Sequence, residues 1–394
     1  MKTINGYIII YYTALICFLS SCISVYEPEG VKSLEGILVV DGMIVDMGTI
    51  INLSRTVKLD NCLQGFAQIN RVGVSDAIVH VIDEGNNVIA VAEPQITDDG
   101  ISTPGTYAIN GKITFMPDMK YALDILIDNK HYRSAFVYPV HTPEIDEVNW
   151  MLNDDISIDI MVSTHDPENK INYYRWAFEE DWEIISPLFA ALRFELSTGE
   201  FIQQSLIGSN NRYYCWKSDK SKSLILGAYD KLSATVISNK KIHQFFPSHA
   251  RYSSPSLYSI LVKQYGLDNE AYGYFENLQR NVEGTGSIFA PQPSEKAGNI
   301  HCLTDPGEPV IGYVAISNAT TYRLFIDLST FDVRWDCSEV QFFQLDELYK
   351  AYREGFGLYD REESDYMCVS RICVDCIERG GTKKKPDFWP NDHQ

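Results

Sequence analysis

The stretch AIVHVIDEGNNVIAV, residues 77–91, decides the fold class. Two apolar runs rich in β-branched residues, 77–82 and 88–91, flank the turn-forming sequence at 84–87. Runs of this length that are bounded by glycine and asparagine are typical of two antiparallel strands joined by a tight turn. We therefore predict that this part of the chain is a β-sheet.

Similar short segments lie on both sides of this hairpin, at residues 37–40, 51–53, 105–107, 121–127 and 131–137. The turn sequence Asp128-Asn129-Lys130 separates the last two and predicts a second hairpin. About seven short strands within ~100 residues is the pattern of an immunoglobulin-like sandwich. We predict such a sandwich over residues 36–140.

A second β-rich domain is predicted over residues 141–330. Residues 156–162 place isoleucine or valine at every second position, and Tyr174, Trp176 and Phe178 repeat this spacing after a turn at 166–169. The pair resembles the start of a fibronectin-type sandwich, with aromatic side chains packed in its core. Further strand candidates are residues 191–196, 212–216, 240–246, 310–317 and 321–326.

The apolar spacing becomes helical within residues 256–282. Residues 257–264 and 271–278 each place apolar side chains three or four positions apart, and Asp268 is a suitable N-cap for the second run. We predict a helical insertion here, and a strand over 257–264 is the alternative. Residues 331–394 read as a loop-rich C-terminal segment with one short helix at 345–353.

Residues 1–21 have the features of a secretory signal peptide. A single charge at Lys2 precedes an apolar run that ends in Leu19-Ser20-Ser21-Cys22, and this run is shorter than the ~20 residues of a membrane-spanning helix. The spacing resembles a bacterial lipoprotein cleavage box, which implies that Cys22 becomes the first mature residue and carries lipid. Each buried CH₂ contributes about 0.8 kcal/mol to such an anchor. Residues 22–35 would be a tether; the alternative is a secreted protein with an ordinary Cys22.

The cysteines of an exported chain are expected to form disulfides. Seven of the nine remain after Cys17 and Cys22, so at least one should stay free or pair elsewhere. Our disulfide candidates are the four that would staple the C-terminal segment, Cys337, Cys368, Cys373 and Cys376, with their pairing left open. The Cys373-Val374-Asp375-Cys376 spacing also suits half a zinc site or a redox pair, but we predict no metal.

The net charge of −20 and the lack of a basic stripe argue against a nucleic-acid partner. The sequence contains no His-x-x-x-His pair, Gly-x-Ser-x-Gly elbow or phosphate loop. We therefore predict no catalytic residues and no cofactor, with a hydrolase of unrecognised site as an alternative. The dense aromatics Tyr213, Tyr214 and Trp216 are candidates for stacking on sugars or peptides. The alternative is that they pack against the core and a neighbouring domain.

Four stretches carry a family resemblance: Leu38–Gly42, GTGSIFAPQPS at 284–294, PVIGY at 309–313, and CVDC with GGT at 373–382. Together they resemble Bacteroidota outer-membrane lipoproteins of the domain of unknown function 4249 family, over nearly the whole chain. The resemblance implies a lipoprotein that is encoded beside a TonB-dependent transporter and is its partner. The family has no established catalytic residues, so none is carried over.

We therefore expect a non-enzymatic accessory subunit of a TonB-dependent transporter that takes part in nutrient capture and uptake. It would be lipid-anchored at the outer membrane, and the acidic residues after Cys22 favour exposure at the cell surface. The residues predicted to dock on the transporter lie in the glycine- and proline-rich loop: Gly284, Gly286, Phe289, Pro291 and Pro293. The alternative is a stand-alone surface lipoprotein that binds a glycan or a peptide.

Overall fold

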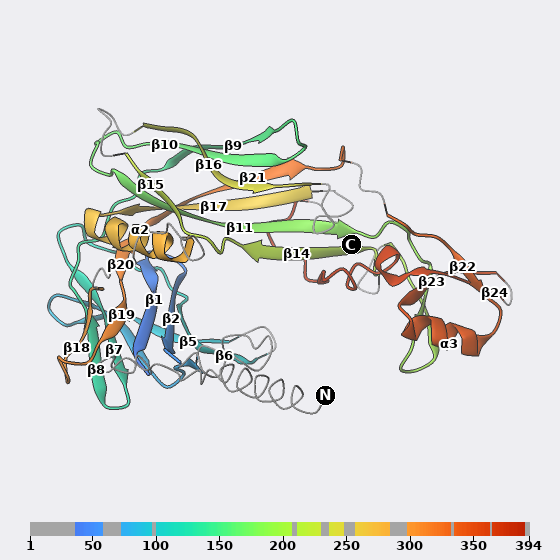
Figure 1. The fold of residues 1–394 in the computed structure, drawn as a ribbon, viewed down its shortest axis with the longest axis horizontal. Helices are drawn as coiled ribbons and strands as arrows, with labels where there is room; N and C mark the ends of the chain where they lie inside the picture. The colour runs from blue at the N-terminus through green and yellow to red at the C-terminus, as the bar shows by residue number, and fades with distance from the viewer. Residues whose placement is uncertain are drawn as a thin grey trace, which may run out of the picture.

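The structure, a computed structural model, is built mainly of β-strands, which confirms the predicted fold class (Figure 1). It describes residues 36–57, 72–96, 100–206, 211–229, 236–247, 257–283, 298–331, 335–362 and 365–390. Three parts can be followed in Figure 1: a first β-sandwich at the N-terminal side, a second sandwich beside it, and a C-terminal module at the far end.

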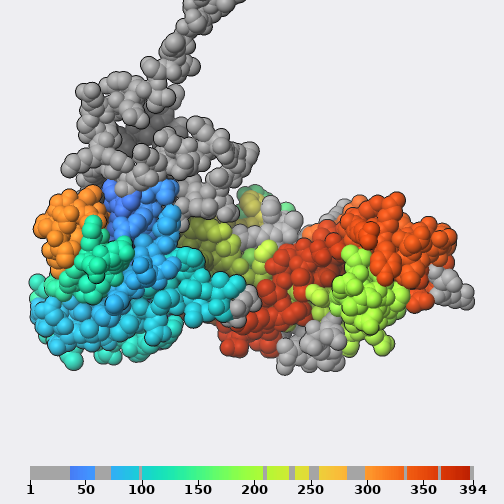
Figure 2. Space-filling view, turned by 90° about the horizontal axis from the view of Figure 1, so that it is seen from below, coloured from blue at the N-terminus to red at the C-terminus, as the bar shows by residue number. Residues whose placement is uncertain are grey.

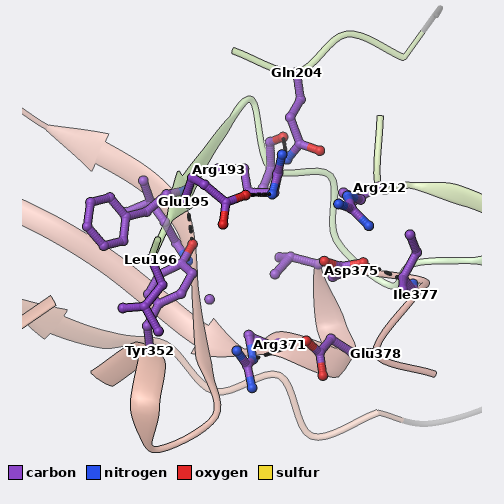
Figure 3. A pocket seen from close by; sticks show the side chains of 15 residues that line it. Arg193, Glu195, Leu196, Gln204, Arg212, Tyr352, Arg371, Asp375, Ile377 and Glu378 are labelled. Atoms are coloured by element: carbon purple, nitrogen blue, oxygen red, sulfur yellow. Dashed lines mark hydrogen bonds and ion pairs between the residues drawn. The ribbon is translucent and has the colours of Figure 1, made fainter. Parts of the chain in front are cut away.

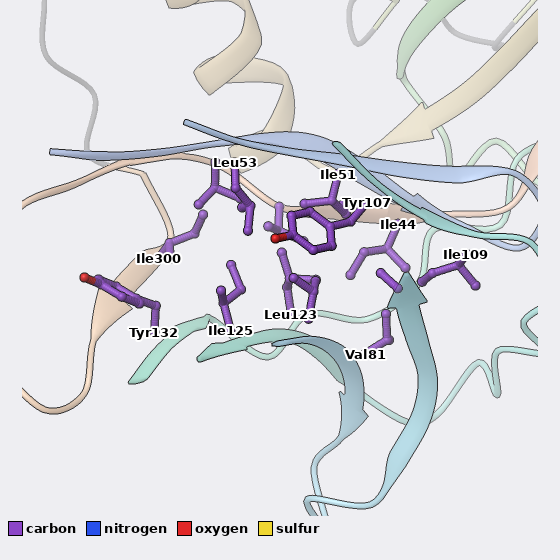
Figure 4. Packing of buried hydrophobic residues seen from close by; sticks show 14 of the residues in the cluster. Ile44, Ile51, Leu53, Val81, Tyr107, Ile109, Leu123, Ile125, Tyr132 and Ile300 are labelled. Atoms are coloured by element: carbon purple, nitrogen blue, oxygen red, sulfur yellow. The ribbon is translucent and has the colours of Figure 1, made fainter. Parts of the chain in front are cut away.

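The first sandwich is a single sheet that folds back on itself, in the order β18-β8-β7-β4-β5-β6-β2-β1-β19. Side chains from β1 and β2, such as Ile44 and Leu53, meet Val81 and Leu123 from β4 and β7 in its core (Figure 4). The strands of its first part are β1 (Leu38–Val45), β2 (Thr49–Arg55), β3 (Val72–Gly73), β4 (Ile78–Asp83), β5 (Val88–Ile96), β6 (Ser102–Ile109), β7 (Tyr121–Ile127) and β8 (Lys130–Ser134).

Both predicted hairpins are confirmed, between β4 and β5 and between β7 and β8. The second turn places Asp128 and Asn129 at φ values of 51° and 62°. Two consecutive residues in this left-handed region are what a two-residue hairpin turn requires, and aspartate and asparagine tolerate it well. In the first turn Asn86 has a φ of 62°, and the Asp83 carboxylate accepts a hydrogen bond from the backbone N–H of Asn87 at 2.8 Å.

The first sandwich is completed by strands that the sequence analysis assigned elsewhere. β18 (Ile300–Cys302) pairs with β8, while β19 (Val310–Gly312) and β20 (Ala315–Ser317) run parallel to β1. The prediction that residues 310–317 belong to the second domain was therefore wrong, and residue 140 does not end the first one. Parallel pairing needs a long crossover connection, so local sequence carries no signal for it.

The second sandwich packs two sheets face to face. One consists of β9 (Ile145–Leu152), β10 (Ile158–His165) and β16 (Val236–Phe245); the other of β11 (Tyr173–Ile185), β14 (Tyr214–Lys220), β15 (Ile225–Ala228), β17 (Leu257–Leu267) and β21 (Ala319–Asp327). Tyr174, Trp176 and Phe178 point from β11 into the core between them, as predicted. Alternation along a strand places every second residue in that core.

The predicted helix over residues 257–264 was wrong, because these residues form strand β17. Tyr258, Ile260 and Val262 alternate into the core, but Leu261 and Tyr265 on the other face are also only partly exposed. A strand covered on both faces carries apolar residues without strict alternation, which imitates helical spacing. The helix of this region is α2 (Asn269–Glu283), and Asp268 caps it as predicted by accepting the Ala271 N–H at 2.7 Å.

The C-terminal module has a core of its own, contrary to the predicted loop-rich tail. Helix α3 (Leu345–Arg353) matches the predicted helix, and strands β22 (Val340–Phe342), β23 (Phe356–Glu362) and β24 (Asp365–Ser370) form a sheet, followed by a 3₁₀ turn, η2 (Arg371–Cys373). The hairpin β12 (Leu192–Glu195) and β13 (Glu200–Gln203) buries Phe194 in a cluster with Leu348 and Leu358. Figure 2 shows this light-green segment lying against the orange-red residues of the module. The core is therefore shared between two distant segments.

The turn between β10 and β11 is held by Asp166. Its buried carboxylate accepts hydrogen bonds from the backbone N–H groups of Glu168, Lys170 and Ile171 at 3.0, 2.6 and 2.8 Å. Burial alone would raise the pKa of Asp166, but these N–H groups and the Lys170 charge hold it below its ordinary value. The ionised form therefore stabilises the folded state.

We expect Asp166→Ala to lower the free energy of unfolding by about 2–4 kcal/mol at pH 7, since it removes three charge-assisted hydrogen bonds. A depressed pKa contributes stability above the unfolded value of ~3.9 and loses it as pH falls through the folded value. The difference from wild type should therefore shrink at pH 3. Urea unfolding at pH 7 and pH 3 measures this difference in unfolding free energy. The control is Asp154→Ala, a change at an exposed position. A difference that is undiminished at pH 3 would contradict this account.

Candidate functional site

A groove of about 770 Å³ lies between the two sandwiches and helix α2. It is lined by Asp41 and Met43 of β1, by Arg175 of β11 and Tyr265 of β17, and by Phe275 of α2. Figure 1 shows α2 at the junction of the two sandwiches. Cavities of this size at domain interfaces are common places for ligands to bind.

The walls are brought together by contacts that join the two sandwiches. Strand β20 of the first sandwich continues through Asn318 into β21 of the second. The Thr142 hydroxyl contacts the Ser317 hydroxyl at 2.8 Å and accepts the Gly266 N–H at 2.8 Å. Ala271 and Phe275 of α2 are buried in a cluster with residues of β1 and β20. The groove is therefore lined by elements that are packed together.

Arg175 is the most distinctive residue of the groove. Its guanidinium lies 5.0 Å from the centre of the Phe275 ring, and it has no hydrogen bond or ion pair to any residue that the structure describes. Burial lowers the pKa of the Arg175 guanidinium and raises that of the neighbouring Tyr265 phenol. An arginine stays protonated even so, which leaves five N–H donors able to bind a ligand.

The charge of the groove contrasts with that of the chain. The whole chain has a net charge of −20, but more cationic than anionic side chains line the groove. The four cationic residues are Arg175, Lys220, Lys222 and Lys263, and the two carboxylates are Asp41 and Glu179. Lys263 is paired with Glu179 at 2.6 Å. The local excess of positive charge and the apolar side chains of Met43, Phe275 and Leu278 favour an anionic ligand with an apolar part.

The sequence analysis missed this groove, although one signal for it was present. Arg175 lies between Tyr174 and Trp176, both of which were predicted to face the core. Alternation along the strand therefore places Arg175 on the opposite face, among residues that a second domain could cover. Nothing local indicated that β1 and α2 would cover it.

The predicted stacking residues Tyr213, Tyr214 and Trp216 do not form an exposed aromatic surface. Trp216 is 3% exposed, because the C-terminal residues cover it: Thr382 donates its N–H to the Trp216 carbonyl at 2.8 Å, and the Lys383 ammonium lies over the indole. Tyr213 and Tyr214 are half-buried and contact each other edge to face. The prediction that Trp216 stacks on a ligand was therefore wrong. Its side chain packs against the C-terminal segment instead.

Two disulfides hold the C-terminal module, Cys215–Cys376 and Cys337–Cys373. Three of the four candidates are thus confirmed as bonded, but Cys368 was wrong and the partner Cys215 was missed. Cys368 lies on β24 and points into the module's own core, where burial raises the pKa of its thiol to about 11. Cys215 is 161 positions from its partner, a separation at which sequence spacing carries no information.

The oxidised sulfurs of Cys373 and Cys376 are not thiolates, so the zinc and free-dithiol alternatives do not fit them. Within the described ranges, no cluster of three or more histidine, cysteine or acidic residues could hold a metal ion. In the same ranges, no helix is long and apolar enough to cross a membrane. Cys22 and the predicted docking residues Gly284, Gly286, Phe289, Pro291 and Pro293 lie outside the described residues.

A comparison with known protein families identifies the family of this chain. Residues 23–323 match the family described as Domain of unknown function (DUF4249). The chain belongs to this family. The DUF4249 match begins directly after Cys22 and ends within β21, so it covers both sandwiches, the groove between them and the hairpin β12–β13. The remainder of the C-terminal module, from β22 onward, lies beyond the match. The chain has no significant match among curated proteins.

Proposed function

We propose that this DUF4249 protein is a non-enzymatic lipoprotein of the outer membrane, anchored through Cys22 and exposed at the cell surface. It acts as an accessory subunit of a TonB-dependent transporter in nutrient capture. The observation that carries the proposal is the lipid-attachment box Leu19-Ser20-Ser21-Cys22 ahead of an acidic, β-rich body. Acyl chains on one sulfur hold such a body at a membrane, where it meets membrane proteins rather than soluble ones.

The groove supports a role in capture. It has the volume of a ligand site and a positive charge excess, and Arg175 has no ion-pair partner among the described residues. An anionic nutrient would approach with its charge toward Arg175 and its apolar part toward Phe275. The subunit would then hold cargo close to the transporter and raise its local concentration, which requires no chemistry on the cargo.

Affinity purification of the tagged protein from native membranes tests the proposal. We expect an outer-membrane β-barrel transporter to co-purify, and a fatty-acid probe to label the protein. Cys22→Ser should lose the label, accumulation in the outer membrane and the co-purifying barrel together. Cys17→Ser, an identical change inside the apolar run of the signal peptide, should keep all three.

Two outcomes would overturn parts of the proposal. A labelled, surface-exposed protein that always purifies alone would be a stand-alone surface binder. A wild-type protein without label would remove the anchor, and with it the reason for a membrane partner. Protease treatment of intact cells decides whether the body faces the exterior.

A further inference from the structure

The C-terminal module contains a smaller cavity of about 230 Å³ (Figure 3). Its lining comes from both sides of the end of the DUF4249 match: residues 190–212 lie within the matched range and residues 352–378 lie beyond it. The hairpin β12–β13 and the residues around it form one side, and β23, η2 and the segment after η2 form the other. Its volume is below the ~300 Å³ at which sites for drug-sized molecules begin, so its ligand would be small.

Gln204 presents an unsatisfied acceptor to this cavity. The side chain is 92% buried, and its Nε2 donates to the Ala190 carbonyl at 3.0 Å. Its Oε1 is buried and has no hydrogen-bond partner among the described residues. Figure 3 shows the Gln204 side chain reaching down into the cavity. Buried amide oxygens nearly always have a partner, so this position calls for a hydrogen-bond donor.

The cavity also contains arginine N–H donors that need a hydrogen-bond acceptor. Arg212 lines the cavity, and its guanidinium has no hydrogen bond or ion pair to any described residue. The Arg371 side chain has one ion pair to a described residue, a long contact from its Nε to Glu378 Oε1 at 3.5 Å. Arg193 is paired with Glu195 at 2.7 Å, but its Nε is buried and has no hydrogen-bond partner in the part of the chain that the structure describes. Planar guanidinium groups bind carboxylates through paired N–H donors.

Carboxylates face the same space. Asp375 and Glu378 line the cavity, and Asp375 accepts the Ile377 N–H through only one of its oxygens, Oδ1, at 2.9 Å. The cavity thus brings together unpaired guanidinium donors, an orphan amide oxygen and carboxylates. A simple anion would satisfy the Arg212 guanidinium and leave Gln204 Oε1 without a donor, while a simple amine would do the reverse.

Two disulfides hold the walls of the cavity in place. The segment that carries Asp375 lies between Cys373 and Cys376, and both are bound by disulfides, to Cys337 and Cys215. The Cys376 N–H also donates to the Arg212 carbonyl at 2.9 Å, which ties the two walls together. A site that is already ordered loses little entropy when a ligand binds.

We propose that this pocket binds a small zwitterion of the α-amino acid class. The ligand carboxylate is held by Arg212 with Arg371, and the ligand ammonium donates to Gln204 Oε1 and to Asp375 or Glu378. The inference is independent of the transporter role, because it concerns binding by the protein alone.

Isothermal titration of the full-length protein in detergent tests this site, with a panel of free α-amino acids as probes. We expect at least one to bind, while acetate and methylammonium, which each carry half of the zwitterion, bind far more weakly. Arg212→Gln should weaken binding roughly ten- to a hundredfold, as expected for loss of charge-assisted hydrogen bonds. The control is Arg353→Gln, an exposed arginine at the end of α3 outside the cavity, which should bind as wild type does.

Thermal unfolding without ligand checks that Arg212→Gln is folded, which we expect because the Arg212 guanidinium has no hydrogen bond or ion pair to any described residue. Three results would overturn the proposal: no α-amino acid binds, acetate binds as tightly as the best amino acid, or Arg212→Gln binds as wild type does. The last would place the binding elsewhere on the protein, such as in the interdomain groove.

Discussion

The double variant Cys215→Ala with Cys376→Ala is expected to lose about 5 kcal/mol of unfolding free energy in the chain-entropy model, at the upper end of measured values. The bond closes a loop with a sequence separation of 161 and joins strand β14 to the C-terminal module. Without it, the unfolded chain gains the freedom that the loop had removed. We also expect the C-terminal residues to separate from β14 and expose Trp216, since Thr382 and Lys383 cover it.

The second disulfide provides a matched comparison. Cys337→Ala with Cys373→Ala opens a loop with a separation of only 36 and should cost roughly 1 kcal/mol less. Replacement of both partners leaves no free thiol that could mispair. Guanidinium unfolding followed by tryptophan fluorescence and limited proteolysis of the tail measure both variants. A variant without Cys215–Cys376 that unfolds at the wild-type midpoint would contradict the prediction.

Gln264→Leu is expected to lower the free energy of unfolding by about 3–5 kcal/mol, although leucine has a similar volume. Gln264 is fully buried in the second sandwich. Its Oε1 accepts the Trp176 Nε1–H at 2.9 Å, and its Nε2 donates to the Pro143 carbonyl at 3.0 Å and to the Thr164 hydroxyl at 3.1 Å. Leucine would leave these groups buried without partners.

A double-mutant cycle separates the network from simple packing. Trp176→Phe removes one donor, so the combined variant should be less unstable than the sum of the two single changes. Gln341→Leu, at an exposed position of β22, is the control and should change stability by no more than about 0.5 kcal/mol. Chemical denaturation gives all four values. Strict additivity of Trp176→Phe and Gln264→Leu would show that the hydrogen bond does not couple them.

Features set by neighbouring residues could be predicted from the sequence. The hairpin turn at Asp128-Asn129 depends on which side chains tolerate a positive φ, and the structure has it where expected. The inward face of β11 follows from the alternation of Tyr174, Trp176 and Phe178. The Asp268 cap and helix α3 follow from signals within a single turn of chain. In each case the deciding interactions span only a few residues.

Features that depend on distant segments could not be predicted. Strand β17 was mistaken for a helix because its second face is covered by other elements, and that cover is not visible in residues 257–264. Cys368 was favoured over Cys215 because it is nearer to the CVDC sequence, but it points into a core that is completed by Phe194. The pocket around Gln204 and Arg212 exists only because that core and two disulfides join residues far apart in the chain.

The sequence by itself determined that this chain is a series of short strands with tight turns, because turn chemistry and side-chain alternation act over a few residues. Only the tertiary structure decided which strands pair in parallel with β1 and which cysteines bond. It also decided that Arg175 faces a groove between two sandwiches. These outcomes depend on the free energy of burying surfaces from segments that are distant in the chain, which no local pattern encodes.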